Sequence, residues 1–134
     1  RLDSPIGPVG HSDGDALFHA ITDAILGALA LPDIGQLFPD TDPRWKDAAS
    51  HVFLEEAARR MREAGYDLSN LDCTIICERP KVFPVKDHLR EAIAGTLGVE
   101  AGRVNVKGKT HELLADRSDK AVEVHVVALL SEAS

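Results

Sequence analysis

The sequence has few cysteines, no long apolar run and no excess of basic residues, and each absence excludes a class of protein. Its 15 Lys and Arg residues against 22 Asp and Glu give a formal charge of −7, which excludes a basic surface for nucleic acid. No apolar run approaches the ~20 residues that cross a bilayer, and no signal-peptide pattern opens the chain. The sequence therefore predicts a soluble, intracellular protein with no nucleic-acid partner and no membrane association.

The two cysteines, Cys73 and Cys77, lie in a segment typical of a β-strand. Residues four apart in a strand point to the same face but are too far from each other for a strain-free disulfide. We therefore expect two buried thiols in a reducing compartment.

Apolar residues with helical spacing predict three helices. The first runs from residue 13 to about 31, with Ser12 and Asp15 as a capping pair. The second has Ser50 as its cap and ends at Gly65, and the third runs from about residue 85 to Gly98. Residues 32–43, after the first helix, are too rich in Pro, Gly and Asp to continue a helix or a strand, and a long loop is expected there.

Short apolar, β-branched runs predict strands at residues 71–78, 104–109 and about 121–130. No repeat or linker divides the chain, so residues 1–134 are predicted to form a single domain. The mixed order of elements favours an α+β fold in which helices cover one face of a sheet. No further helix remains for the other face, so we expect the sheet to pack against other copies of the chain.

The densest polar cluster lies around the start of the first predicted helix, from His11 to Asp23. Asp15, His19 and Asp23 are spaced at i, i+4 and i+8 and share a helix face. Imidazole and carboxylate side chains suit zinc. An Asp near a helix start is also ordinary capping, and a helical His is more often surface or core, so the spacing leaves both interpretations open.

Three further clusters carry polar groups suited to a ligand. Asp33 and residues 40–42 offer oxygens to a hard cation or to sugar hydroxyls, although simple turn chemistry explains them as well. Residues 105–112 end a predicted strand with groups able to contact phosphate, or else form ordinary solvated surface. Residues 79–81 form a turn that offers backbone amides and a cation to a nucleotide.

Several motifs together resemble the 2-C-methyl-D-erythritol 2,4-cyclodiphosphate synthase family. They occur in the family's order and spacing at residues 11–24, 33–35, 38–42, 74–76, 80–81 and 105–107, and at Thr110 and Glu112. The resemblance implies a lyase of non-mevalonate isoprenoid biosynthesis that converts 4-diphosphocytidyl-2-C-methyl-D-erythritol 2-phosphate to the cyclic diphosphate and CMP. Such a reaction needs positioning and cations rather than a nucleophilic side chain.

The resemblance also implies roles for individual residues. It makes His11 and Thr110 catalytic, His19 a ligand of zinc, and Glu112 a ligand of a second divalent ion, magnesium or manganese. It assigns substrate binding to His11 and Ser12, to a sugar-binding wall of Asp33, Ile34, Gly35, Phe38, Pro39, Asp40, Thr41 and Asp42, to a nucleotide pocket of Cys77, Glu78, Arg79, Pro80, Lys81, Val82 and Phe83, and to a phosphate region of Lys109, Thr110, His111 and Glu112. It is weakest at Arg117, which aligns with the family's diphosphate-contacting arginine.

Family members are homotrimers with sites between subunits, which agrees with the sheet face left bare. The resemblance implies a small nucleotide diphosphate as substrate, and a location in the bacterial cytoplasm or, in a eukaryote, in the plastid stroma. The family's Asp-x-His strand, which supplies two zinc ligands, has no counterpart in residues 1–134, and we expect it to lie outside the printed sequence. Two alternatives stay open: a trimeric binding protein without activity, and a zinc hydrolase using His11 and His19.

Overall fold

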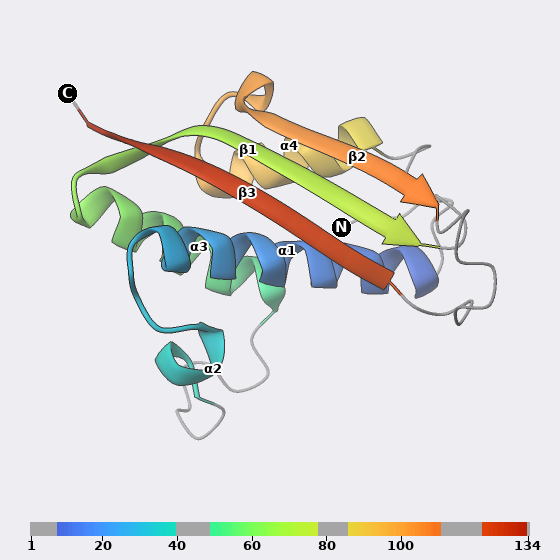
Figure 1. Cartoon of the computed structure of the whole chain (residues 1–134), viewed down its shortest axis with the longest axis horizontal. Coiled ribbons are helices and arrows are strands. Elements are labelled where there is room, and N and C mark those ends of the chain that lie inside the picture. Colours follow the sequence, from blue (N-terminus) through green and yellow to red (C-terminus); the bar gives the residue numbers. More distant parts are fainter. Residues whose placement is uncertain (1–7, 40–48, 78–85, 111–121, 134) are drawn as a thin grey trace.

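The fold is built on a three-stranded sheet (Figure 1). The computed structural model describes residues 8–39, 49–77, 86–110 and 122–133. The strands are β1 (Tyr66–Cys77), β2 (Val104–Thr110) and β3 (Val122–Glu132), in the order β2-β1-β3. The central strand β1 runs parallel to β2 and antiparallel to β3. Strand β1 begins before the predicted residue 71 because its first part pairs with the end of β3, Tyr66 with Glu132.

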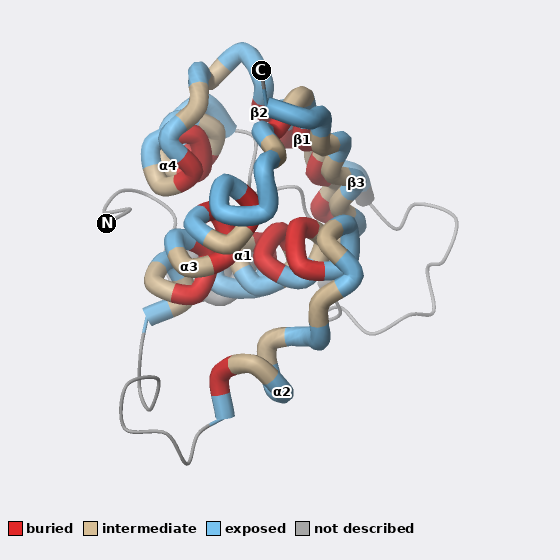
Figure 2. The backbone as a smooth tube through the Cα atoms, turned by 90° about the vertical axis from the view of Figure 1, so that its left-hand side faces the viewer, coloured by how far each residue is buried: buried red, intermediate tan, exposed pale blue. Residues whose placement is uncertain are grey.

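Three helices lie on one side of this sheet: α1 (Pro8–Ala28), α3 (Ser50–Glu63) and α4 (Lys86–Leu97) (Figures 1 and 2). Their buried residues gather where the helices face the sheet (Figure 2). The fully buried side chains come from every layer and include Leu17, Ile21, Leu54, Met61, Leu71, Ile75, Ile93 and Val106. This arrangement confirms the predicted sheet with helices on one face.

Two helix ends confirm the sequence prediction. Gly65 has a φ of +89° and follows Ala64, the C-cap residue of α3; Gly98 has a φ of +72° and directly follows α4. A residue with a side chain rarely adopts this left-handed conformation, so glycine is favoured at both positions. None of the described helices is long and apolar enough to cross a membrane.

The predicted helix starts were wrong in detail. Helix α1 begins at Pro8 rather than at residue 13, because proline suits a first helical turn, where its missing N–H has no partner to lose. Ser12 and Asp15 therefore lie inside the helix and do not cap its start. Ser50 is the first residue of α3 rather than its cap, since the N-cap position belongs to Ala49.

The predicted loop at residues 32–43 contains a short helix, α2 (Ile34–Leu37). Asp33 caps it, because its side chain accepts a hydrogen bond from the amide of Gln36 at 3.1 Å. A single turn of 3-10 helix, η2 (Ala101–Arg103), also precedes β2 without having been predicted.

The face of the sheet opposite the helices is uncovered within the described part of the chain. Along each strand alternate residues turn away from the helices, as in Asp72 and Thr74 of β1. On β3 this face carries Val127 and Leu129, which are 68% and 60% exposed. Two large apolar side chains on an open sheet face are typical of a surface that binds a partner.

Candidate functional site

The polar face of α1 carries the cluster that the sequence singled out. Asp15, His19 and Asp23 are all exposed, while Leu17, Ile21 and other apolar residues of the same helix are buried on its opposite side. This confirms that the three residues share a face separate from the apolar one.

The imidazole of His19 lies against α3. Its ring stands 6.0 Å from the ring of Phe53, at 84° to it, in an edge-to-face contact. Phe53 is buried, so it forms a fixed apolar wall beside an imidazole that is itself exposed. Edge-to-face pairs of this kind favour one ring orientation over others. His19 is thus held in place while keeping access to solvent.

The two aspartates on either side of His19 are tied to other helices. Asp15 Oδ1 accepts a hydrogen bond from the hydroxyl of Ser50 at 2.9 Å, at the first residue of α3. Asp23 Oδ1 accepts one from the backbone N–H of Ile34 at 3.2 Å, at the first residue of α2. Sequence reasoning missed both contacts, because their partners lie 35 and 11 residues away along the chain.

The end of α2 is packed into the core. Phe38 is only 3% exposed, and its ring lies 5.2 Å from the ring of Phe53 at an angle of 37°. The guanidinium of Arg60 covers the same ring at 5.6 Å. In the predicted sugar-binding wall, Asp33, Gly35 and Pro39 are exposed and Ile34 is half-buried. Phe38 is buried and anchors this segment to the core.

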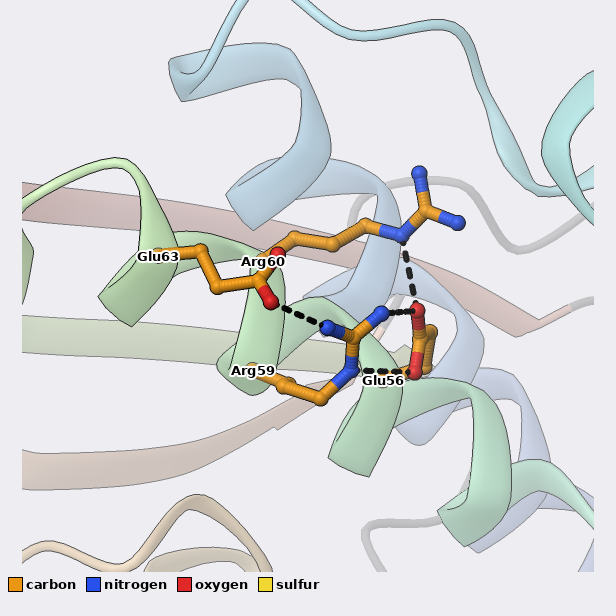
Figure 3. Close-up of polar contacts among 4 residues, drawn as sticks. All are labelled: Glu56, Arg59, Arg60 and Glu63. Atoms are coloured by element: carbon orange, nitrogen blue, oxygen red, sulfur yellow. Dashed lines mark hydrogen bonds and ion pairs between the residues drawn. The ribbon is translucent and has the colours of Figure 1, made fainter.

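Arg60, which lies over the ring of Phe38, belongs to a charged network on α3. Figure 3 shows this network, formed by Glu56, Arg59, Arg60 and Glu63. Arg60 Nε donates to Glu56 Oε2 at 2.9 Å, and Arg59 binds both oxygens of Glu56 and reaches Glu63 at 2.6 Å. The hydrogen bond from Arg59 is the main cause that lowers the pKa of Glu56, with Arg60 contributing and partial burial opposing. Glu56 therefore stays ionised and orients both arginines.

A second group of predicted residues meets at one end of the sheet. Cys77 at the end of β1 pairs in register with Thr110 at the end of β2, and Ile76 pairs with Lys109. The predicted nucleotide pocket and the predicted phosphate region therefore begin side by side. The first turns of α1, which include His11, lie at this same end of the molecule (Figure 1). Carboxyl ends of parallel strands are common binding positions in mixed α and β proteins.

Several predicted residues are beyond what the structure describes. His11, Ser12, Cys77 and Thr110 are placed by their backbone alone. Asp40, Thr41, Asp42, Glu78, Arg79, Pro80, Lys81, Val82, Phe83, His111, Glu112 and Arg117 lie outside the described residues. Their assigned roles stay predictions.

The predicted site residues that the structure describes fall into two groups, which lie apart within one chain. Asp33 caps α2, which Asp23 of α1 contacts, while Cys77 and Lys109 lie at the tips of β1 and β2. Figure 1 shows α2 below the second half of α1, away from the strand tips. Among the described residues, the wall segment 33–39 therefore lies apart from Cys77 and Lys109 within a single chain.

The described residues fit part of a metal site. They contain no group of three or more His, Cys, Asp or Glu side chains arranged to hold an ion. His19 offers an exposed imidazole, which is a common zinc ligand, whereas the carboxylates of Asp15 and Asp23 already accept hydrogen bonds. This arrangement fits His19 as one ligand of zinc and leaves the others to groups beyond the described ranges.

Two further groups of the sheet, Cys73 and Asp72, have structural roles. Burial raises the pKa of the Cys73 thiol to about 12, so Cys73 is an uncharged core side chain rather than a nucleophile. On the open face, Asp72 accepts hydrogen bonds from Lys107 and Asn105, each at 3.0 Å. The bond from Lys107 is the main cause that keeps the pKa of Asp72 below its ordinary value.

A shallow hollow of about 350 Å³ lies between the end of α4 and the start of β1, and no predicted site residue lines it. Arg62 and Arg103 reach into it, but Arg62 donates to the carbonyl of Leu97 and Arg103 donates to that of Leu68 at 3.0 Å. Both guanidinium groups thus hold neighbouring backbone, and Arg62 satisfies a carbonyl at the end of α4.

Comparison with known proteins gives consistent results. The model of the YgbB family matches residues 1–131. A chloroplastic 2-C-methyl-D-erythritol 2,4-cyclodiphosphate synthase of Catharanthus roseus is 54% identical over 125 residues, 92% of this chain and 53% of its own length. The synthase of Aquifex aeolicus is 52% identical over 112 residues, which cover 84% of this chain and 72% of that protein. The chain thus spans about half the length of the plant relatives and more of the bacterial ones.

Solved structures show the same likeness. A structure of 2C-methyl-D-erythritol-2,4-cyclodiphosphate synthase superimposes with a TM-score of 0.77 at 39% identity, covering 85% of this chain and 74% of that one. A CDP complex of the Plasmodium falciparum protein IspF gives a TM-score of 0.74 at 32% identity, with coverages of 87% and 70%.

Proposed function

The chain belongs to the YgbB family of 2-C-methyl-D-erythritol 2,4-cyclodiphosphate synthases, and on this premise we propose that it catalyses the cyclisation itself. The substrate is 4-diphosphocytidyl-2-C-methyl-D-erythritol 2-phosphate. An oxygen of its 2-phosphate attacks the β-phosphorus, the bond from that phosphorus to the bridging oxygen breaks, and CMP leaves with the bridging oxygen. No water is consumed, which makes the enzyme a phosphorus-oxygen lyase.

The observation that carries this proposal is the pairing of Cys77 with Thr110 at the tips of two parallel strands. It starts the predicted nucleotide pocket, residues 77–83, beside the predicted phosphate region, residues 109–112. A diphosphate linked to a cytidine needs these two regions to be neighbours. The CDP complex of the Plasmodium falciparum relative supports the same class of ligand.

In the proposed mechanism the protein bends a polyanion and stabilises the charge of its transition state. His11 and Thr110 position the two phosphates in line, with Ser12 and Lys109 beside them. The exposed wall residues Asp33 and Gly35 hold the hydroxyl groups of the sugar. Holding the reacting groups in line converts the attack into an intramolecular step of low entropic cost.

We include zinc and a second divalent ion, magnesium or manganese, among the cofactors. His19 supplies one zinc ligand and Glu112 binds the second ion. When bound, such ions neutralise phosphate charge and polarise the attacked phosphorus. The exposure of the His19 ring and its fixed orientation against Phe53 support the first assignment.

We propose that the active protein is a homotrimer with its sites between subunits. Two features support this assembly: the exposed Val127 and Leu129 on the open sheet face, and the separation of wall residues 33–39 from the tips of β1 and β2 within one chain. In a trimer, α2 of one subunit would lie beside the strand tips of the next. We also propose the predicted location, the bacterial cytoplasm or the plastid stroma; the chloroplastic name of the plant relative supports a plastid.

The test is CMP release by protein of native length. With the substrate, zinc and magnesium, we expect CMP to appear at a rate proportional to enzyme, and chelation to stop it. Protein that binds CDP but releases no CMP above background would instead be the non-catalytic binding homologue.

A further inference from the structure

We propose that Asp23 is a positioning residue, which fixes the sugar-binding wall relative to the metal ligand His19. The proposal rests on the function proposed above. It assigns no contact with substrate to Asp23, which acts through the backbone of α2.

His19, Asp23 and the start of α2 are connected through the backbone of α1 and one hydrogen bond. His19 and Asp23 lie one turn apart on the same face of α1, so the helix backbone fixes their separation. Asp23 Oδ1 then accepts the hydrogen bond from Ile34 N at 3.2 Å. Asp33, the exposed wall residue, directly precedes Ile34 and caps α2. One carboxylate thus connects the metal-binding face of α1 to the wall.

Helix α2 needs this connection because it has only four residues. A helix of one turn is unstable alone, since nucleation fixes several residues for a single hydrogen bond. Its end is held by the buried ring of Phe38. Its start carries exposed or half-buried residues, and the amide of Ile34 would lose its partner in α1 without Asp23.

The contact also distinguishes Asp23 from a metal ligand. Its oxygen faces a backbone amide, and an asparagine offers the same amide an equivalent acceptor without the negative charge. A metal ligand would not tolerate this change so well, because zinc prefers an anionic oxygen to an amide. Asp23→Asn therefore separates the two roles.

The chain also offers a matched control. Ser50 donates a hydrogen bond to Asp15 on the same face of α1, but it ties that helix to α3 and not to α2. Ser50→Ala removes a tie of the same kind while leaving the start of α2 untouched. It should resemble the wild type in both kinetics and exchange of the α2 amides.

The experiment compares the wild type, Asp23→Ala, Asp23→Asn and Ser50→Ala at native length, measuring kcat, KM, zinc per chain, CDP affinity and hydrogen exchange of residues 33–38. For Asp23→Ala we expect KM to rise about tenfold or more, with kcat less affected. Zinc content and CDP affinity should be unchanged, and exchange at the start of α2 should be faster. Asp23→Asn should stay within about threefold of the wild type in all of these.

Three results would overturn the proposal: wild-type KM and exchange in Asp23→Ala, loss of zinc from Asp23→Ala without rescue by asparagine, or an equal rise in KM for Ser50→Ala. A wild type that releases no CMP would instead refute the proposed function. Exchange at residues 33–38 would still decide in that case whether Asp23 holds α2.

Discussion

The ring of His19 stands edge-to-face with the ring of Phe53, 6.0 Å between centroids. Phe53 in turn packs on Phe38 at the end of α2. The predicted metal ligand and the segment of the predicted sugar wall thus rest on one buried side chain. From this shared support we predict that Phe53, although it has no polar group, matters for the proposed activity.

Phe53→Leu is the first prediction. Leucine keeps the site apolar but removes the edge-to-face contact, which is worth about 0.5–1.5 kcal/mol beyond burial. Zinc affinity should fall by roughly threefold to tenfold, and kcat/KM should fall with it. Isothermal titration with zinc measures the first effect. Met61→Leu, a volume-conserving change at another buried residue of α3, serves as a control for altered packing. Unchanged zinc affinity in Phe53→Leu would contradict the supporting role.

His19→Ala should lose zinc and nearly all activity while the helix content stays the same. Alanine is the better helix former, and His19 is exposed, so the fold loses little. His11→Ala should instead lower turnover with the metal content kept. Elemental analysis and circular dichroism check both variants, and an active, zinc-replete His19→Ala protein would rule out the ligand assignment.

The open face of the sheet provides a test of assembly. Val127→Asp places a charge at a residue that is 68% exposed; its position opposite Asp72 costs an isolated chain only about 1 kcal/mol or less. In a trimer built on this face, the charge would be buried without a partner, which costs several kcal/mol. We expect the variant to be monomeric and inactive by light scattering and CMP release. Glu55→Lys, on the exposed side of α3, is the control and should stay trimeric. A trimeric Val127→Asp protein would place the interface elsewhere.

The pKa of Glu56 sets a pH dependence of stability. Because this pKa is lowered in the folded protein, the ion pairs with Arg59 and Arg60 contribute fully above the ordinary value of 4.5. Their contribution is lost as the pH falls through the lower, folded pKa. The difference in unfolding free energy between the wild type and Glu56→Gln should therefore be constant from pH 7 to about 5 and shrink at lower pH. Urea unfolding at a series of pH values measures it, with Glu55→Gln as the control; a difference independent of pH would contradict the assignment.

The three long helices and their buried faces were predictable because their pattern is local. The apolar spacing of α3, from Phe53 to Met61, is readable in the sequence, and so is the glycine that ends it. The length of β1 was not predictable, because its first residues are strand only through pairing with β3. Extension of a strand depends on a partner far along the chain.

Within the site, residue types were predictable and their contacts were not. Asp15 and Asp23 were recognised by spacing, yet they serve as acceptors for groups on α3 and α2. Helix α2 was not predicted because residues 32–43, which contain it, are rich in Gly, Pro and Asp, and this composition favours a loop. It becomes helical through the Asp33 cap and the tie to Asp23.

The most direct test of the central claim is the product of the reaction, observed by phosphorus NMR in water enriched in ¹⁸O. Cyclisation consumes no water, so the account predicts a cyclic diphosphate and CMP that both carry no ¹⁸O. A linear product with ¹⁸O on phosphorus would mean that water is the nucleophile, and the chain would then be a hydrolase rather than a cyclase.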